Sequence, residues 1–150
     1  MLPHKHVLIS AAVGALGWWR SGLPAAFVAA LAAGTLPDSD HAVDYLYLRY
    51  SGEHRLILPL HGYEYGLIGG ALALATGSRI GQAAAASYLI HLLADQWENR
   101  THRLGYSLLF RARHRFRIEE ISSVPEAAIR GREDDLRLLS RLFRPHAGPD

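Results

Sequence analysis

The residues best suited to chemistry in this chain are a histidine and an aspartate four positions apart, His91 and Asp95. On an α-helix this spacing places both side chains on one face, with Cβ atoms roughly 5–6 Å apart. An imidazole nitrogen and a carboxylate oxygen held in this way can bind one metal ion together. The same spacing also suits a hydrogen-bonded contact inside a helix bundle, so the pair alone leaves both interpretations open.

A second group of ligand-type side chains follows an apolar stretch, where Asp38, Asp40 and His41 fall within four residues. An aspartate at the start of a helix commonly caps it by accepting backbone N–H bonds. Capping accounts well for one aspartate and not at all for His41. We therefore expect a metal-binding or catalytic role for this group.

His61 and Glu64 are three residues apart, so they share a face if a helix begins by His61. The ordinary alternative is a histidine at a helix end and a first-turn glutamate favoured by the helix dipole. His54 and Arg55 precede them in a loop. Beside a metal ion an arginine can bind two oxygens of a phosphate or a carboxylate, whereas alone it is an ordinary surface residue.

The remaining histidines differ in their surroundings. His4 and His6 precede the first apolar run but, being two residues apart, cannot share a helical face. We expect His6, the nearer of the two to that run, to point inward. His102, His114 and His146 lie among polar residues, and we expect them at the surface.

The composition predicts an all-α protein. Of the 150 residues, 49% are hydrophobic, and alanine and leucine dominate over β-branched residues. We expect a compact bundle of about five to six helices. The expected helices cover residues 4–19, 24–36, 43–50 and 79–99, a Gly/Ala-rich stretch ending near residue 76, and a C-terminal amphipathic helix over residues 125–143. The alternating charges of residues 111–117 predict a short basic extended arm.

The charge is divided unevenly along the chain. Residues 1–99 carry a net charge of −2 and residues 100–150 a net charge of +4. We interpret residues 1–99 as a helical metal-binding core, and residues 100–150 as a basic arm and C-terminal helix in the same domain or as an appendage. The chain has no cysteine, which excludes disulfides and thiolate metal sites.

The ligand-type residues fall repeatedly at the ends of apolar helices, where ionisable groups are costly unless they are paired or bound to a metal. A set of His and Asp without Cys suits Zn²⁺, Mn²⁺ or Fe²⁺ better than Ca²⁺. More than four such ligands can hold two ions roughly 3.5–4 Å apart, an arrangement used to hydrolyse phosphate esters. We therefore expect one or two divalent ions, with Zn²⁺ as the first choice and Mn²⁺ or Fe²⁺ as alternatives.

The order of these motifs resembles the YdjM-like family of predicted membrane-bound metal-dependent hydrolases. The resemblance covers about residues 4–99 and rests on an N-terminal histidine, Leu36-Pro37-Asp38-Ser39-Asp40-His41, His54-Arg55, His61 and His91-Leu92-Leu93-Ala94-Asp95. It implies a helical, membrane-associated metal hydrolase, with metal ligands at His6, Asp38, Asp40, His61, His91 and Asp95.

The zinc-dependent phospholipase C and S1/P1-type nucleases are more distantly similar. They use a His followed by a Glu one turn later, which here corresponds to His61 and Glu64. The chain departs from the family between its two central histidines, because His54 and His61 are seven residues apart and Leu60-His61-Gly62 replaces Thr-His-Ser. The basic C-terminal part lies outside the resemblance.

We expect a metal-dependent hydrolase of a phosphoester, either a small molecule or a lipid phosphate, with metal-activated water as the nucleophile. Asp40 or Glu64 would be the general base or a second-metal ligand, and Arg55, beside His54, would stabilise the developing negative charge. The expected metal ligands are His6, Asp38, His41, His61, His91 and Asp95.

Two other functions fit the same residues. A non-enzymatic, membrane-associated helical scaffold would use them as helix caps and internal pairs. A nucleic-acid binder would contact phosphates and stack bases through Arg111–Arg117. The resemblance implies transmembrane helices and the inner membrane, with a soluble cytoplasmic protein as the alternative, although each apolar stretch is only 11–15 residues long. The sequence does not indicate the substrate or the oligomeric state.

Overall fold

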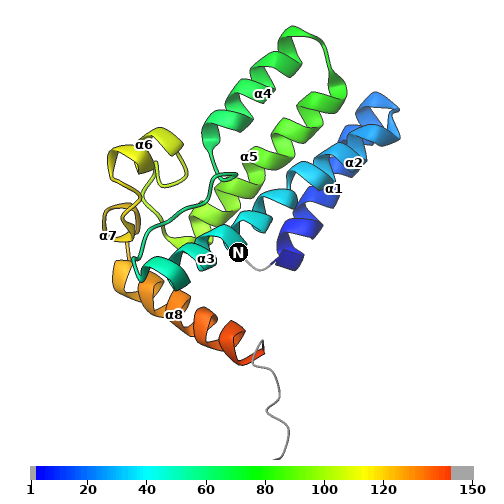
Figure 1. Cartoon of the computed structure of the whole chain (residues 1–150). Helices are drawn as coiled ribbons and strands as arrows, with labels where there is room; N and C mark the ends of the chain where they lie inside the picture. Colours follow the sequence, from blue (N-terminus) through cyan, green and yellow to red (C-terminus); the bar gives the residue numbers. More distant parts are fainter. Residues whose placement is uncertain (1–2, 143–150) are drawn as a thin grey trace, which may run out of the picture.

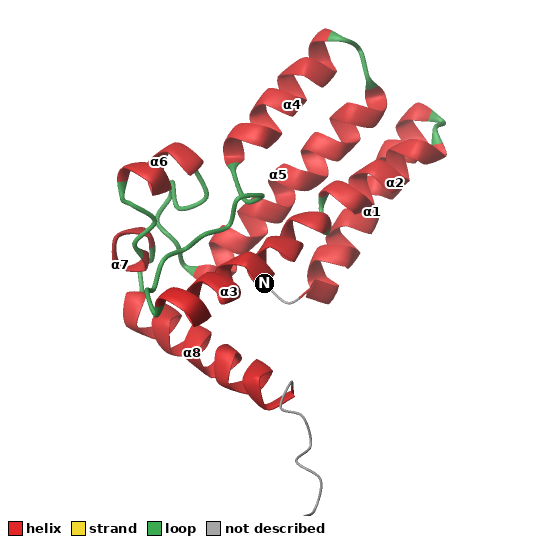
Figure 2. Cartoon of the chain, viewed as in Figure 1, coloured by secondary structure: helices red, strands yellow, loops and turns green. Residues whose placement is uncertain are grey.

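The structure is a computed structural model that describes residues 3–142, and the side chains of residues 4–138 (Figure 1). Its helices in chain order are α1 (Pro3–Ser21), α2 (Pro24–Ala33), the 3-10 helix η1 (Leu36–Asp40), α3 (His41–Ser51), α4 (Tyr63–Ala75), α5 (Arg79–Asn99), α6 (Leu108–Arg113), α7 (Ile118–Ile121) and α8 (Pro125–Leu142). Within the described residues there is no strand, only two isolated bridges, which confirms the all-α prediction (Figure 2).

Helices α1, α2, α4 and α5 form an elongated bundle in which α5 packs against the other three (Figure 1). Small side chains allow this close packing, because Ala26, Ala30 and Ala83 form a buried cluster between α2 and α5. A Cβ atom on Gly17 of α1 would lie 2.9 Å from the Cβ of Ala83. The alanine- and glycine-rich sequence therefore brings the helices that carry His6 and His91 close together.

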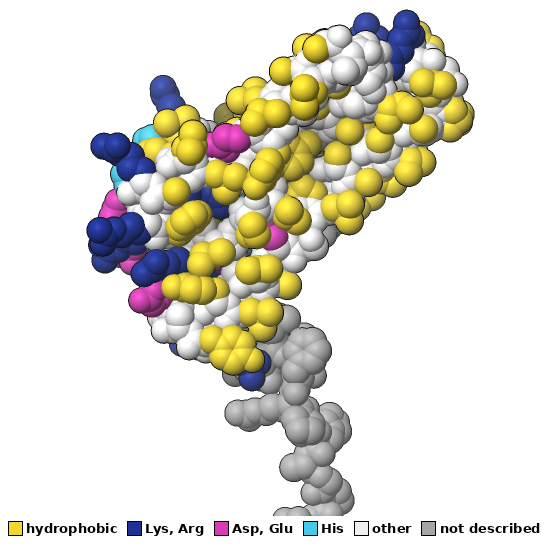
Figure 3. Space-filling view, turned by 45° about the horizontal axis from the view of Figure 1, so that its top comes forward, with side chains coloured by type: hydrophobic (Ala, Val, Ile, Leu, Met, Phe, Trp, Pro, Cys, Tyr) yellow, Lys and Arg dark blue, Asp and Glu magenta, His cyan; other side chains and the backbone are white. Residues whose placement is uncertain are grey.

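Large apolar side chains are exposed over much of this bundle, as Figure 3 shows. Among the described residues, however, no helix combines the length and the hydropathy that a membrane crossing needs, so the expectation of transmembrane helices is wrong. The apolar helices α2 and α4 have only 10 and 13 residues, against about 20 for a bilayer. The longer helices α1 and α5, with 19 and 21 residues, carry charged and polar side chains.

Helices α3, α6, α7 and α8 lie together at one end of the bundle (Figure 1). The carboxylate of Glu64 at the start of α4 accepts hydrogen bonds from Ser107 and from the backbone N–H groups of Leu108 and Leu109. Arg132 of α8 forms an ion pair with Asp44 of α3, with Nη2 and Oδ2 2.6 Å apart. Residues 100–138 thus contact the residues 1–99 core through buried and half-buried polar groups.

The basic segment differs from the extended arm that its alternating charges suggest. Residues 108–113 form the short helix α6, which Ser107 caps by accepting a hydrogen bond from the backbone N–H of Phe110. Arg111 and Arg113 lie on different faces of this helix, so that Arg111 is buried and Arg113 is exposed. The rest of the segment, residues 114–116, is a turn, and Arg117 forms an isolated bridge with Arg55.

Several predicted helix boundaries agree with the structure. The helix predicted over residues 79–99 coincides with α5, and Ser78 caps it by accepting a hydrogen bond from the backbone N–H of Gly81. The second helix ends earlier than predicted, at Ala33, because the chain turns at Gly34 and continues as η1. The predicted end of the last helix at residue 143, and also His146, lie outside the described residues.

Candidate metal centre

Six histidine and aspartate side chains converge where the start of α1, η1, the start of α3, the residues before α4, and α5 meet. They form two overlapping groups, and within each group the possible ligand atoms lie within 4.8 Å of one another. The first group is His6, Asp38, His91 and Asp95, and the second is Asp38, His41, His61 and Asp95. Together the groups contain the six expected ligands His6, Asp38, His41, His61, His91 and Asp95, but not Asp40, which the family resemblance also implies as a ligand.

His91 is held in one tautomer by the backbone of the turn after α2. Its Nδ1 atom lies 3.0 Å from the carbonyl oxygen of Gly34. Because a carbonyl oxygen can only accept, Nδ1 carries the ring proton and Nε2 presents a lone pair. Burial lowers the pKa of His91 to about 4, and the neighbouring His6 adds to this effect, so the imidazole is neutral near pH 7.

His61 is oriented in a similar way by Asp40. The His61 Nδ1 atom lies 2.9 Å from Oδ1 of Asp40, whose other oxygen accepts a hydrogen bond from the backbone N–H of Leu60. The carboxylate beside Nδ1 favours the tautomer of neutral His61 that carries its proton on this atom and presents a lone pair on Nε2. A carboxylate behind a histidine is the usual arrangement that orients a metal ligand.

The two lone pairs point at each other. His61 Nε2 and His91 Nε2 are 3.0 Å apart, and Oδ2 of Asp95 lies 3.4 Å from the first and 3.6 Å from the second. Oδ1 of Asp38 completes the group, 3.8 Å from His61 Nε2 and 3.7 Å from His91 Nε2. Four electron-pair donors therefore face one small region, which suits a cation.

The electrostatics of this region also favour a positive charge. Burial acts to lower the pKa of His61, but the carboxylates of Asp40 and Asp95 outweigh it and hold the pKa above its usual value. Burial raises the pKa of Asp38, and the nearby Asp95 adds to the rise. Three carboxylates close together are costly without a cation, and either a proton or a metal ion can supply the positive charge.

His6 joins the cluster from α1. Its side chain is 1% exposed, and its Nε2 lies 3.0 Å from Oδ1 of Asp95 and 4.0 Å from Oδ1 of Asp38. Its ring also packs against that of His91, with centroids 3.9 Å apart. His4, two residues earlier, is exposed, as the sequence argument expects.

Solvent reaches the cluster on the side of Asp38 and His41. Their side chains are 22% and 38% exposed, whereas those of the other four members are 1% exposed or less. His41 Nε2 lies 3.9 Å from Oδ1 of Asp38, and burial lowers the pKa of His41. Solvent and small solutes therefore have access to the cluster on this side.

The structure places the four predicted catalytic residues outside the two ligand groups. Asp40 contacts the back of His61, and Glu64 accepts the hydrogen bonds that start α6. His54 Nε2 lies 3.4 Å from a carboxylate oxygen of Glu133, and Arg55 pairs with its neighbour Glu53. His54 and Arg55 thus face a separate polar hollow, which Arg115 and Arg117 also line.

Sequence reasoning missed three groups that support the cluster. One is the backbone carbonyl of Gly34, a group that every residue has and that the residue type therefore does not reveal. The second is Tyr106, which is 1% exposed and whose ring centroid lies 5.7 Å from that of His61. The third is Arg111, which is fully buried and donates a hydrogen bond from Nη2 to the carbonyl oxygen of His61. Burial lowers the pKa of Arg111, and in sequence it resembles the exposed arginines around it.

Comparisons of the chain with protein-family models, with curated proteins and with solved structures find no match. The likeness to membrane-bound metal-dependent hydrolases therefore remains a prediction from motif order. The buried His/Asp group itself is independent of that likeness, and it could hold a metal ion.

Proposed function

We propose that this chain is a metal-dependent hydrolase of phosphoesters. The observation that carries the proposal is the contact between Nε2 of His61 and Nε2 of His91, 3.0 Å apart, with carboxylate oxygens of Asp38 and Asp95 within 4 Å of both atoms. Two neutral imidazoles in these tautomers have no proton to share between their Nε2 atoms, so either a proton or a metal ion bound between them stabilises the contact, and we assign a metal ion. Nitrogen and carboxylate ligands without thiolates suit Zn²⁺ first, then Mn²⁺ or Fe²⁺.

The overlap of the two ligand groups supports up to two ions. Asp38 and Asp95 belong to both groups, and each group adds two histidines of its own. Carboxylates shared between neighbouring ions are suited to a two-ion site that binds both the attacking and the leaving oxygen of a phosphoester. An ion bound here would lower the pKa of bound water to about 7, where hydroxide is available as the nucleophile.

Other residues around the site orient its ligands and limit the access of water. Asp40 and the Gly34 carbonyl orient His61 and His91, and the buried position of these imidazoles keeps bulk water away from their Nε2 atoms. Asp38 lies on the solvent side of the cluster, where its carboxylate would bind the metal next to the attacking water. His41 lies beside it at the entrance, where the substrate arrives.

A hydrolysis assay on matched histidine variants tests the proposal. His4 and His6 are on the same helix, and only His6 reaches the cluster. We expect His6→Gln and His91→Gln to lower the rate of p-nitrophenyl phosphate hydrolysis at least about 100-fold, and His4→Gln to leave it unchanged. Chelation should remove the wild-type activity and added Zn²⁺ or Mn²⁺ should restore it. Wild-type protein that hydrolyses nothing with any of these metals would overturn the proposal.

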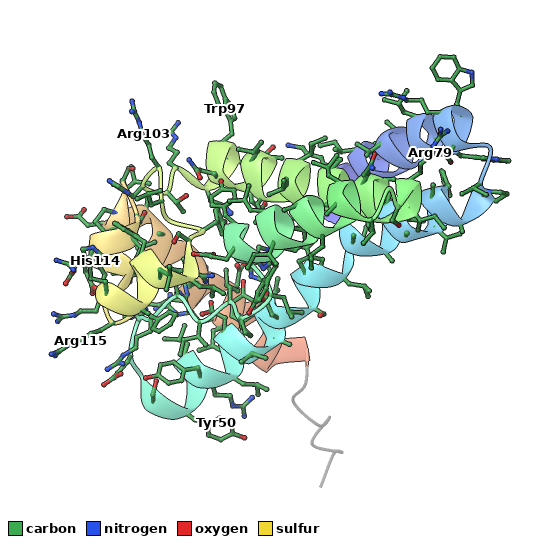
Figure 4. The ribbon with its side chains drawn as sticks, turned by 90° about the horizontal axis from the view of Figure 1, so that it is seen from above. Tyr50, Arg79, Trp97, Arg103, His114 and Arg115 are labelled. Atoms are coloured by element: carbon green, nitrogen blue, oxygen red, sulfur yellow. The ribbon has the colours of Figure 1, made fainter. Side chains whose placement is uncertain are left out.

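A second candidate function, nucleic-acid binding, is favoured by exposed arginines on the side of α6 and α7. Figure 4 shows Arg103 and Arg115 pointing away from the molecule with His114 between them, and Arg113 and Arg117 are also exposed. This arrangement predicts salt-dependent binding of a single-stranded oligonucleotide, weakened in an Arg113→Gln, Arg115→Gln variant. Binding that is absent at low salt would exclude this function.

A further inference from the structure

A cavity of about 320 Å³ opens beside the candidate metal centre, between the end of α5, α7 and α8. Its walls are mainly apolar. They include Leu56, Leu58, Ile118, Ile121, Val124 and Ala128, and the polar lining includes the carboxylates of Glu98 and Asp135 besides two arginines, Arg100 and Arg132. The volume lies at the lower end of the range for small-molecule sites, which are usually apolar with a few polar groups that fix the orientation of the ligand.

The cavity reaches the metal centre at one end. His41, which belongs to the second ligand group, is part of its lining. Tyr106 also lines it, and the other side of Tyr106 faces the ring of His61. A molecule in the cavity is therefore next to the side of the cluster that solvent reaches.

Arg132 of α8 lines the same cavity and is 9% exposed. Its Nη2 pairs with Asp44, but its Nε and Nη1 have no hydrogen-bond partner among the described residues. Asp44 in turn also accepts a hydrogen bond from the backbone N–H of Ile57. Buried donors without an acceptor are costly, and a guanidinium with free N–H groups is well suited to the oxygens of a phosphate.

We propose that this cavity is the substrate site and that the substrate is a phosphate ester of a small apolar alcohol. The apolar group fills the space between α7 and α8, and Arg132 donates to a phosphate oxygen while the phosphorus lies towards His41. The hydrolysis of this ester rests on the proposed function. The binding of a phosphate ester with an apolar group does not depend on that function, because it is argued only from the cavity and from Arg132.

Gly131 offers a direct way to close the cavity. It lines the cavity on α8, and a Cβ atom added there meets no atom within 4 Å. Gly131 is exposed at the edge of the cavity, so Gly131→Leu adds a large side chain at this edge without a clash and narrows the opening, and it also favours the helix. Gly131→Ala is the matched control, because it makes the same change in helix propensity with little added volume.

The test measures the binding of hexyl phosphate and methyl phosphate by calorimetry. We expect wild type and Gly131→Ala to bind hexyl phosphate at least about 10-fold more tightly than methyl phosphate, and Gly131→Leu to lose this preference. Arg132→Gln should weaken hexyl phosphate binding about 10-fold, while Arg130→Gln, on the exposed face of α8, should not. If Arg132→Gln does not fold, the Gly131 pair decides. Equal affinities for both esters in wild type, or a Gly131→Leu variant that keeps the preference, would overturn the proposal.

The same variants separate this proposal from the proposed function. If wild type prefers hexyl phosphate and Gly131→Leu does not, but neither ester is hydrolysed with any metal, the binding site stands and the hydrolase fails. If both esters are hydrolysed and Gly131→Leu affects neither, the hydrolase stands and the cavity is not its substrate site.

Discussion

The Nε2 atoms of His61 and His91 face each other at 3.0 Å, while the Nδ1 atom of each ring lies beside an acceptor on the opposite side. The Nδ1 atom of His61 lies 2.9 Å from Oδ1 of Asp40, and that of His91 lies 3.0 Å from the Gly34 carbonyl oxygen. These two contacts come from segments far apart in the chain, so the fold has to be complete before the lone pairs meet. The contact between the two Nε2 atoms therefore depends on the folded structure. It is the main observation in support of the proposed metal site.

The first prediction concerns the contact behind His61. Asp40→Asn keeps the size of the side chain but removes the negative charge that holds the proton on His61 Nδ1. We expect zinc affinity to fall about 10- to 100-fold, the usual effect of losing such a supporting carboxylate. Competition with a chromophoric chelator measures this, with the exposed neighbour Ser39→Ala as the control. Unchanged zinc affinity would mean that Asp40 only stabilises the loop, through its hydrogen bond from Leu60, and does not support the metal site.

The second prediction concerns the turn that positions His91. A Cβ atom on Gly34 would lie 2.0 Å from Oγ of Ser10 and 2.5 Å from Oγ of Ser87. We expect Gly34→Ala to lower the free energy of unfolding by about 1–3 kcal/mol, as overpacked core positions do, and to weaken metal binding. Gly69→Ala is the control, because its Cβ meets no atom within 4 Å and alanine stabilises a helix by about 0.5–1 kcal/mol relative to glycine. Denaturant unfolding of both variants tests the contrast.

Part of this site was predictable from sequence because part of it is local. The spacing of His91 and Asp95 fixes their common face once the segment is helical, and the apolar run after His6 explains why it points inward. The roles of Glu64 and Arg55 were not predictable in this way, because they depend on where α6 and the loop before α4 lie in three dimensions. Transmembrane helices were wrongly expected because the family resemblance implied them, although the apolar stretches of 11–15 residues are short for a bilayer.

The third prediction concerns the two faces of α6. Arg111 is fully buried against the His61 carbonyl, whereas Arg113 two residues later is exposed. We expect Arg111→Ala to lower the free energy of unfolding by about 2–4 kcal/mol, because it leaves a cavity and removes the donor to His61. Arg113→Ala should change it by less than about 0.5 kcal/mol. Equal, small effects in thermal or denaturant unfolding would contradict the inward position of Arg111.

The fourth prediction is a pH dependence from Glu64. Burial acts to raise its pKa, but hydrogen bonds from Ser107 and from the backbone N–H groups of Leu108 and Leu109 outweigh this and hold the pKa below 4.5. The stabilisation is therefore fully present above pH 4.5 and is lost as the pH falls through the folded-state pKa. Glu64→Gln should lose about 1 kcal/mol at pH 7, the usual value of a helix cap. The loss should shrink in acid, and a loss that stays constant down to pH 2 would contradict the capping role.

The most direct test of the central claim is anomalous diffraction at the zinc absorption edge, from crystals grown with zinc. We predict a peak about 2.0–2.1 Å from Nε2 of both His61 and His91, with these two atoms moved apart to roughly 3.3 Å to fit tetrahedral bonds. Asp95 should contribute an oxygen to the same ion. Zinc bound only elsewhere, with the two Nε2 atoms still in direct contact, would contradict the account.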